Sequence, residues 1–102
     1  MSEFSTLVTR YVTPLLRQWG FKKHGAFGRG ALYDVADYRR GDLEVQLIFS
    51  LHPYDYPLIG IRLEMRDANG LLFDRFYPPV EGGIKAMLEA ATSDIKETVD
   101  AI

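Results

Sequence analysis

Residues 43–51 read Leu-Glu-Val-Gln-Leu-Ile-Phe-Ser-Leu, and this stretch decides the fold class. Its apolar side chains stand at every second position, namely Leu43, Val45, Leu47, Phe49 and Leu51. Alternation with a period of two is typical of a β-strand that packs one face on a core and turns the other outward. The same pattern recurs at Ile59, Ile61, Leu63 and Met65. The sequence therefore predicts two amphipathic strands in the middle of the chain.

Two further strands, over about residues 31–39 and 71–77, flank the middle pair and are joined to it by short turns. Gly41-Asp42 suits a two-residue type II′ turn, and Asn69-Gly70 suits a type I′ turn. Because such turns connect antiparallel neighbours, we expect two β-hairpins.

These turns also set which residues lie opposite each other. The expected pairs are Arg39 with Glu44, Val35 with Ile48, Tyr33 with Ser50, Arg66 with Phe73, Glu64 with Arg75, and Arg62 with Tyr77. A three-residue loop of residues 68–70 would instead place Glu64 against Asp74, two like charges, so we rank that register second.

Both ends of the chain predict amphipathic helices. In the first, the apolar residues follow helical spacing at Phe4, Leu7, Val8, Tyr11, Val12, Leu15, Leu16 and Trp19. In the second, the apolar stripe consists of Ile84, Met87, Leu88, Ala91, Ile95, Val99 and Ile102. Pro14 removes one backbone hydrogen bond of the first helix, so we expect a kink there and not the end of the helix.

Helices and strands that each have one apolar face can bury those faces only against each other. We therefore predict a two-layer α+β sandwich of order α-β-β-β-β-α, with a four-stranded antiparallel sheet and both helices on one of its faces. A single domain covers residues 1–102. The chain has no Cys, which excludes a disulfide scaffold. No apolar run approaches the roughly 20 residues that span a bilayer, and the N-terminus lacks a secretory signal, so we expect no membrane partner and a cytoplasmic location.

The formal net charge of −2 hides an asymmetry between the two parts of the chain. Residues 1–40 hold seven of the twelve Lys and Arg residues but only three of the fourteen acidic residues. The near-neutral total argues against a protein that binds polyanions with its whole surface, although a local basic patch remains compatible with it.

The predicted registers leave one sheet face turned away from the helices, and on it aromatic and apolar residues are mixed with charges. Aromatic residues and Arg are enriched at protein interfaces. We assign partner binding to Tyr33, Val35, Ile48, Arg62, Phe73, Arg75 and Tyr77. The leading hypothesis is a non-enzymatic interaction domain that uses this face to bind a protein partner or to form a homodimer. The alternative is a solvated face with scattered apolar residues.

A second hypothesis places a small-ligand or enzymatic pocket at the loop of residues 52–57. Its candidate residues are His52, Tyr54, Asp55 and Tyr56. A His and a carboxylate are the groups that acid–base chemistry needs, although capping of the loop explains them as well. The sequence has neither G-x-S-x-G nor a zinc-ligand spacing. We therefore assign no catalytic residue, metal or cofactor.

A third hypothesis is RNA binding through the basic segment 17–29. Its cations are Arg17, Lys22, Lys23 and Arg29, and they are interleaved with Trp19, Phe21 and Phe27. Cations bind phosphates, and rings stack on bases. Trp19 belongs to the apolar stripe of the first helix, however, and the signature strand of an RNA-recognition motif is missing. Nucleic acid therefore ranks below a protein partner.

Residues 14–29 read Pro-Leu-Leu-Arg-Gln-Trp-Gly-Phe-Lys-Lys-His-Gly-Ala-Phe-Gly-Arg. This run resembles the start of small bacterial α+β domains of unknown function, some of which are thought to be immunity proteins of toxin systems. In that pattern a helix ends in P-x-L-x-x-x-G-F-x-K, and an aromatic-x-Arg segment opens a sheet. The resemblance covers about the first 30 residues, implies an α+β fold and brings no catalytic residue.

Overall fold

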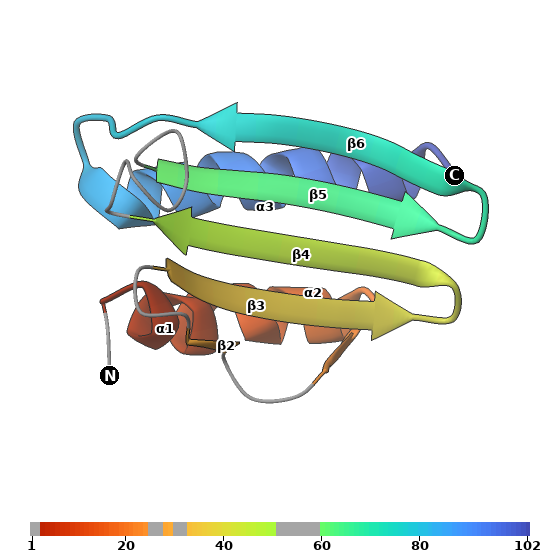
Figure 1. The fold of residues 1–102 in the computed structure, drawn as a ribbon. Helices are drawn as coiled ribbons and strands as arrows, with labels where there is room; N and C mark the ends of the chain where they lie inside the picture. Colours follow the sequence, from red (N-terminus) through yellow and green to blue (C-terminus); the bar gives the residue numbers. More distant parts are fainter. Residues whose placement is uncertain (1–2, 25–27, 30–32, 51–59) are drawn as a thin grey trace.

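The computed structural model describes residues 3–24, 28–29, 33–50 and 60–102. Four long strands form an antiparallel sheet in which they lie in chain order (Figure 1). They are β3 (Tyr33–Arg40), β4 (Leu43–Ser50), β5 (Gly60–Asp67) and β6 (Gly70–Tyr77). These are the four strands that the sequence predicts.

The sheet is wider than predicted. Two short strands, β1 (Lys22–Lys23) and β2 (Gly28–Arg29), both pair antiparallel with β3 and so add a fifth position to the sheet. They cover an edge whose backbone groups would otherwise lack strand partners. A two-residue strand is too short to show an alternating pattern, which is why the sequence did not reveal them.

The hairpin of β3 and β4 has the predicted register. Arg39 lies opposite Glu44, and Tyr33 lies opposite Ser50. In the turn, Gly41 has a φ of +59°, a left-handed value that glycine adopts without steric cost. The sequence predicted this register because the glycine stands at the first central position of a two-residue turn.

The hairpin of β5 and β6 differs from the prediction. Asp67 lies opposite Gly70, so the turn consists of residues 68–69 and not of residues 69–70. The carboxylate of Asp67 accepts a hydrogen bond of 2.8 Å from the backbone N–H of Asn69, which starts the turn one residue earlier. Leu72 is then an extra residue in β6, because Arg66 lies opposite Leu71 while Met65 lies opposite Phe73.

This β-bulge decides which side chains face the helices. Beyond it, Tyr77 lies opposite Ile61 and Arg75 lies opposite Leu63, on the buried face of β5. Glu64 lies opposite Asp74, as in the register that was ranked second. The prediction that Phe73, Arg75 and Tyr77 share the outer face is therefore wrong.

The N-terminal helical segment consists of α1 (Glu3–Leu7), the π-helical turn η1 (Val8–Val12) and α2 (Thr13–Gln18). The helical conformation continues past Pro14, and the disturbance that this proline causes takes the form of a π turn before it. The N–H of Thr13 bonds to the carbonyl of Val8, five residues back. The buried residues of the segment include Phe4, Val8, Val12 and Leu16, four residues apart.

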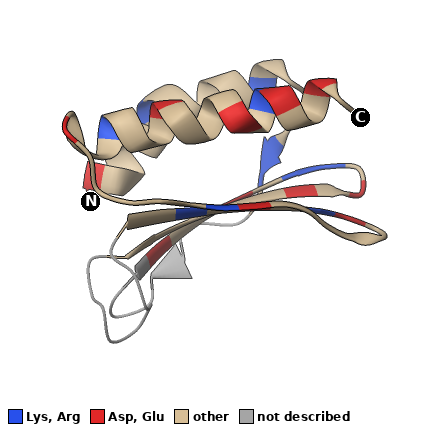
Figure 2. Cartoon of the chain, turned by 90° about the horizontal axis from the view of Figure 1, so that it is seen from above, with Lys and Arg blue, Asp and Glu red and all other residues tan. Residues whose placement is uncertain are grey.

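The second helix, α3 (Gly83–Asp100), begins within one residue of its predicted start. Figure 2 shows α3 and the N-terminal segment lying together on one side of the sheet. The core fills the space between these two layers. Its largest fully buried side chains are Tyr38, Phe4, Phe21, Leu16, Leu47, Ile61, Leu63, Met65, Ile95, Val8, Val12 and Val45. Within the described ranges, no helix has the length and apolarity that a membrane crossing requires.

Candidate functional site

An apolar groove runs between the N-terminal helical segment and α3. It encloses about 360 Å³ and lies between residues 7–15 on one wall and residues 85–92 on the other. Its lining consists of Leu7, Arg10, Tyr11, Val12, Pro14, Leu15, Lys85, Leu88, Glu89 and Thr92. This volume is within the range of about 300–1,000 Å³ that is usual for binding pockets.

Apolar side chains line the groove at two depths. Val12 and Leu88 are 1% and 3% exposed, whereas Tyr11 and Leu15 are 42% and 37% exposed. Tyr11 and Leu15 belong to the apolar stripe of the first helix, but they are exposed and do not join the core. The stripe of eight apolar positions is wider than the contact of the segment with the sheet, so the positions on its flank remain at the surface.

The rim of the groove is charged. Lys85 reaches across from α3 and places its Nζ 4.9 Å from the ring centre of Tyr11. Arg10 and Glu89 complete the set of charged lining residues. Within the part of the chain that the structure describes, none of these three charged groups forms an ion pair. Two cations and one anion are thus available to a bound molecule.

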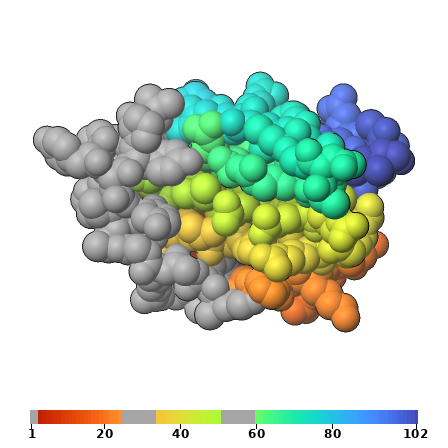
Figure 3. Space-filling model, turned by 45° about the vertical axis from the view of Figure 1, so that its right-hand side comes forward, coloured from red at the N-terminus to blue at the C-terminus, as the bar shows by residue number. Residues whose placement is uncertain are grey.

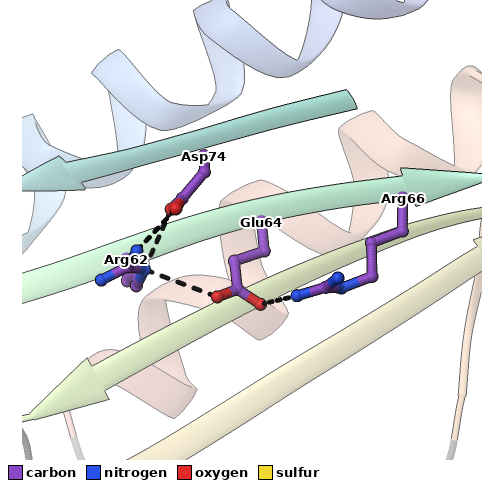
Figure 4. Close-up of polar contacts among 4 residues, drawn as sticks. All are labelled: Arg62, Glu64, Arg66 and Asp74. Carbon is purple, nitrogen blue, oxygen red and sulfur yellow. Dashed lines mark hydrogen bonds and ion pairs between the residues drawn. The ribbon is translucent and has the colours of Figure 1, made fainter. Parts of the chain in front are cut away.

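The opposite face of the sheet carries an ion-pair network. Figure 4 shows Arg62 between the carboxylates of Glu64 and Asp74, whose strand positions oppose each other. Arg62 donates to Asp74 from Nε at 2.9 Å and from Nη2 at 2.5 Å, and its Nε lies 3.5 Å from Glu64. Arg66 binds the other oxygen of Glu64 at 3.0 Å. Arg62 thereby removes the like-charge repulsion that made this register look unfavourable.

The predicted partner-binding residues are divided between the two faces. Val35, Ile48 and Arg62 belong to the outer face, where the strand registers align them across the sheet. Figure 3 shows β3 to β6 side by side on this face. The backbone of Tyr33 is placed in β3, whereas its side chain is outside the described set.

The other three predicted partner residues point the other way. Phe73 packs against the hydrophobic core. The hydroxyl of Tyr77 donates a hydrogen bond to the carboxylate of Asp94 in α3, and Arg75 binds the same carboxylate at 3.1 Å. The bulge at Leu72 causes this reversal, because one extra residue exchanges the two faces of a strand.

Asp37 is the most perturbed carboxyl group of the outer face. The pKa of Asp37 is raised to about 6. Burial is the largest cause, and a hydrogen bond to Glu44 and electrostatic repulsion from Glu44 act in the same direction. Arg39 lies 3.6 Å from Asp37 and 3.3 Å from Glu44, so one guanidinium serves two carboxylates. Among the described residues, Asp37 Oδ1 is buried without a hydrogen-bond partner.

The structure adds no support to the predicted pocket at residues 52–57. His52, Tyr54, Asp55 and Tyr56 lie outside the described residues. In the described ranges, no group of His and acidic residues is arranged to hold a metal ion.

The basic segment is partly described. Lys22 and Lys23 form β1, Arg17 is exposed near the end of α2, and the backbone of Arg29 lies in β2. Phe21 is 1% exposed and cannot stack on a base. The RNA hypothesis therefore loses one of the rings on which it depended.

Comparison of the chain with protein-family models, with curated proteins and with solved structures found no match.

Proposed function

We propose that this protein is a non-enzymatic interaction domain that binds an amphipathic helix of a protein partner in the groove between its N-terminal helical segment and α3. The observation that carries the proposal is the exposure of Tyr11 and Leu15 beside the buried Val12 and Leu88. Exposed apolar groups that share one concave surface are the usual mark of a binding site.

The spacing of the groove walls favours a helix as the occupant. Leu7, Tyr11 and Leu15 follow one another every four residues along one wall. Four residues are close to one helical turn, so these side chains follow one another along the wall. Ridges and gaps of this spacing accept the side chains of a third helix at positions i, i+3 or i+4, and i+7.

The charges of the rim favour acidic residues on that helix. Arg10 and Lys85 bring two positive charges to the groove, against one negative charge from Glu89. Carboxylates that flank the apolar stripe of the partner would pair with these cations. An interaction role also agrees with the resemblance of the first 30 residues to immunity-like domains, whose task would be to bind another protein.

Two synthetic peptides test the proposal by fluorescence anisotropy. Both form an amphipathic helix with leucines on one face, and they differ only in carrying Glu or Lys beside that face. We expect the acidic peptide to bind more tightly than the basic one, by about tenfold at low salt. We expect Leu15→Asp to abolish binding, because it places a charge in the apolar groove.

Leu71→Asp is the matched control. Leu71 is also an exposed leucine, at 51%, but it lies in β6 and outside the groove. Binding of the acidic peptide should survive this change. The proposal fails if neither peptide binds, or if Leu15→Asp and Leu71→Asp weaken binding equally.

A further inference from the structure

The sheet face that is turned away from the helices carries its charges in two parallel rows. The strand registers align Asp37, Gln46, Glu64 and Asp74 across β3 to β6, and we name this set the acidic row. The neighbouring set, which we name the arginine row, consists of Arg39, Glu44, Arg66 and Leu71. Two residues of a strand span about 7 Å, so the two rows lie next to each other on one face.

The two rows are complementary under a two-fold rotation. The axis runs parallel to the sheet, in the plane of contact between the two copies, perpendicular to the strands and midway between the rows. A second copy that packs face to face about this axis brings its arginine row over the acidic row of the first. Asp37 then faces the second copy's Arg39, and Glu64 faces the second copy's Arg66. Each of these contacts occurs twice, because a two-fold interface repeats every contact.

The uncharged member of the acidic row fits the same arrangement. Gln46 lies between Asp37 and Glu64 in the acidic row, and Glu44 lies beside it in the arginine row. The rotation places the amide of Gln46 opposite the second copy's Glu44. An amide N–H donates to a carboxylate, so this contact is a hydrogen bond and not a clash of charges.

Within a single copy, Asp37 shares its cationic partner with a second carboxylate. Asp37 shares the guanidinium of Arg39 with Glu44, whereas Glu64 contacts both Arg62 and Arg66. In the dimer, the second copy's Arg39 lies above Asp37 as a second cationic neighbour.

We propose that the protein forms a two-fold dimer through this sheet face, with a second copy of the chain as its partner. Two sheets packed face to face lie about 10 Å apart with their strands nearly aligned. The groove lies on the helical side and remains open, so the dimer does not depend on the proposed function. Because the contact is mostly polar, we expect a weak dimer whose dissociation constant rises with salt.

Charge exchange between the rows tests the dimer by sedimentation equilibrium. One double variant, Arg39→Glu with Arg66→Glu, makes both rows acidic, and another, Asp37→Lys with Glu64→Lys, makes both rows basic. We expect each variant alone to be monomeric, because like charges then face each other. Mixed in equal amounts, they should form a heterodimer that is about tenfold tighter than the wild-type dimer at low salt.

The matched control carries the same charge change on the helical side. Arg17→Glu with Lys96→Glu alters two exposed cations of α2 and α3 and should leave the wild-type dissociation constant unchanged. Dimerisation that this control weakens as much as the Arg39 and Arg66 changes would overturn the proposal. A wild-type protein that stays monomeric at low salt up to its solubility limit would overturn it as well.

A measurement on the wild-type chain covers the case in which a variant fails to fold. Amide NMR spectra recorded over a range of protein concentration should show shifts that are confined to the acidic and arginine rows. Residues 7–15 and 85–92 of the groove serve as the internal control and should not shift. Concentration-dependent shifts in the groove, with none in the rows, would contradict the sheet-face dimer.

Discussion

Tyr77 of β6 donates a hydrogen bond from its hydroxyl to the carboxylate of Asp94 in α3, and this bond ties the edge of the sheet to the helices. Burial and the Asp94 carboxylate raise the pKa of the Tyr77 hydroxyl, so the hydroxyl stays protonated and remains a donor. The bond exists because the bulge at Leu72 turns Tyr77 toward the helices. The presence of this bond therefore reports on the register of the hairpin of β5 and β6.

Removal of this hydroxyl should destabilise the fold. Tyr77→Phe leaves the Asp94 carboxylate without one of its donors, and we expect the free energy of unfolding to fall by about 1–2 kcal/mol. Urea unfolding followed by circular dichroism measures this change. Tyr11→Phe, which alters a ring at the surface of the groove, is the control and should have little effect. Equal effects of the two changes would contradict the observed register.

Deletion of Leu72 should be tolerated. Because Leu72 is the extra residue of the bulge, its removal joins Leu71 directly to Phe73 and keeps both on their present faces. We expect the deleted protein to fold, with a thermal midpoint within about 5 °C of the wild type. Deletion of Asp74 should unfold the hairpin, because the residues on one side of the deletion would then point to the opposite face of the sheet. If the Leu72 deletion unfolds the protein while the Asp74 deletion does not, the bulge has been misplaced.

Two neighbouring leucines distinguish the core from the groove. Leu16 is fully buried, and we expect Leu16→Ala to cost about 2–5 kcal/mol of stability because it opens a cavity. Leu15 is exposed, and Leu15→Ala should cost less than about 1 kcal/mol. The comparison uses chemically identical substitutions one residue apart in α2, measured by urea unfolding. A cost for Leu15 that equals the cost for Leu16 would show that the groove belongs to the core.

Asp37 should make stability depend on pH in a defined direction. Its pKa in the folded state, about 6, lies above the ordinary value of 3.8, so the folded state binds this proton more tightly. The contribution of Asp37 to stability is therefore lost as the pH rises through 6 and returns as the pH falls toward 4. The groups that face it are Glu44, Arg39 and His24.

Asp37→Asn tests this dependence, because an amide does not titrate. Above about pH 7 the variant should be more stable than the wild type by about 1 kcal/mol, a value that allows for screening by water. The difference should shrink toward about pH 4. Unfolding is measured at low protein concentration, so that dimer formation does not affect the comparison. A variant that is less stable than the wild type at neutral pH would contradict the cost that burial imposes on the ionised Asp37 carboxylate.

The sequence predicts much of this fold because its signals are local. The alternation in β4 and β5 identifies both strands, and Gly41 alone determines the register of the first hairpin. The second register could not be predicted, because it depends on a hydrogen bond from the backbone of Asn69 to the carboxylate of Asp67. Like-charge repulsion between Glu64 and Asp74 disfavours this register in the sequence, but Arg62 bridges the two carboxylates in the structure.

The groove was missed for a related reason. Helical periodicity shows that Tyr11 and Leu15 lie on the apolar side of the first helix, but not whether the sheet reaches them. Pro14 predicts a disturbance of the helix, and in the structure this disturbance is a π turn that keeps the buried residues four apart. The first helix has eight apolar positions, which is more than its contact with the sheet requires. This excess is the signal that could have indicated an exposed binding surface.

The central claim is that the groove between the N-terminal segment and α3 binds an acidic amphipathic helix. Paramagnetic relaxation enhancement tests it most directly, with a nitroxide label on the acidic peptide and an amide NMR spectrum of the isotope-labelled protein. The proposal predicts strong broadening of the amides of residues 7–15 and 85–92, and none over residues 43–47 of the sheet. Broadening that is centred on the sheet, or spread evenly over the surface, would contradict it.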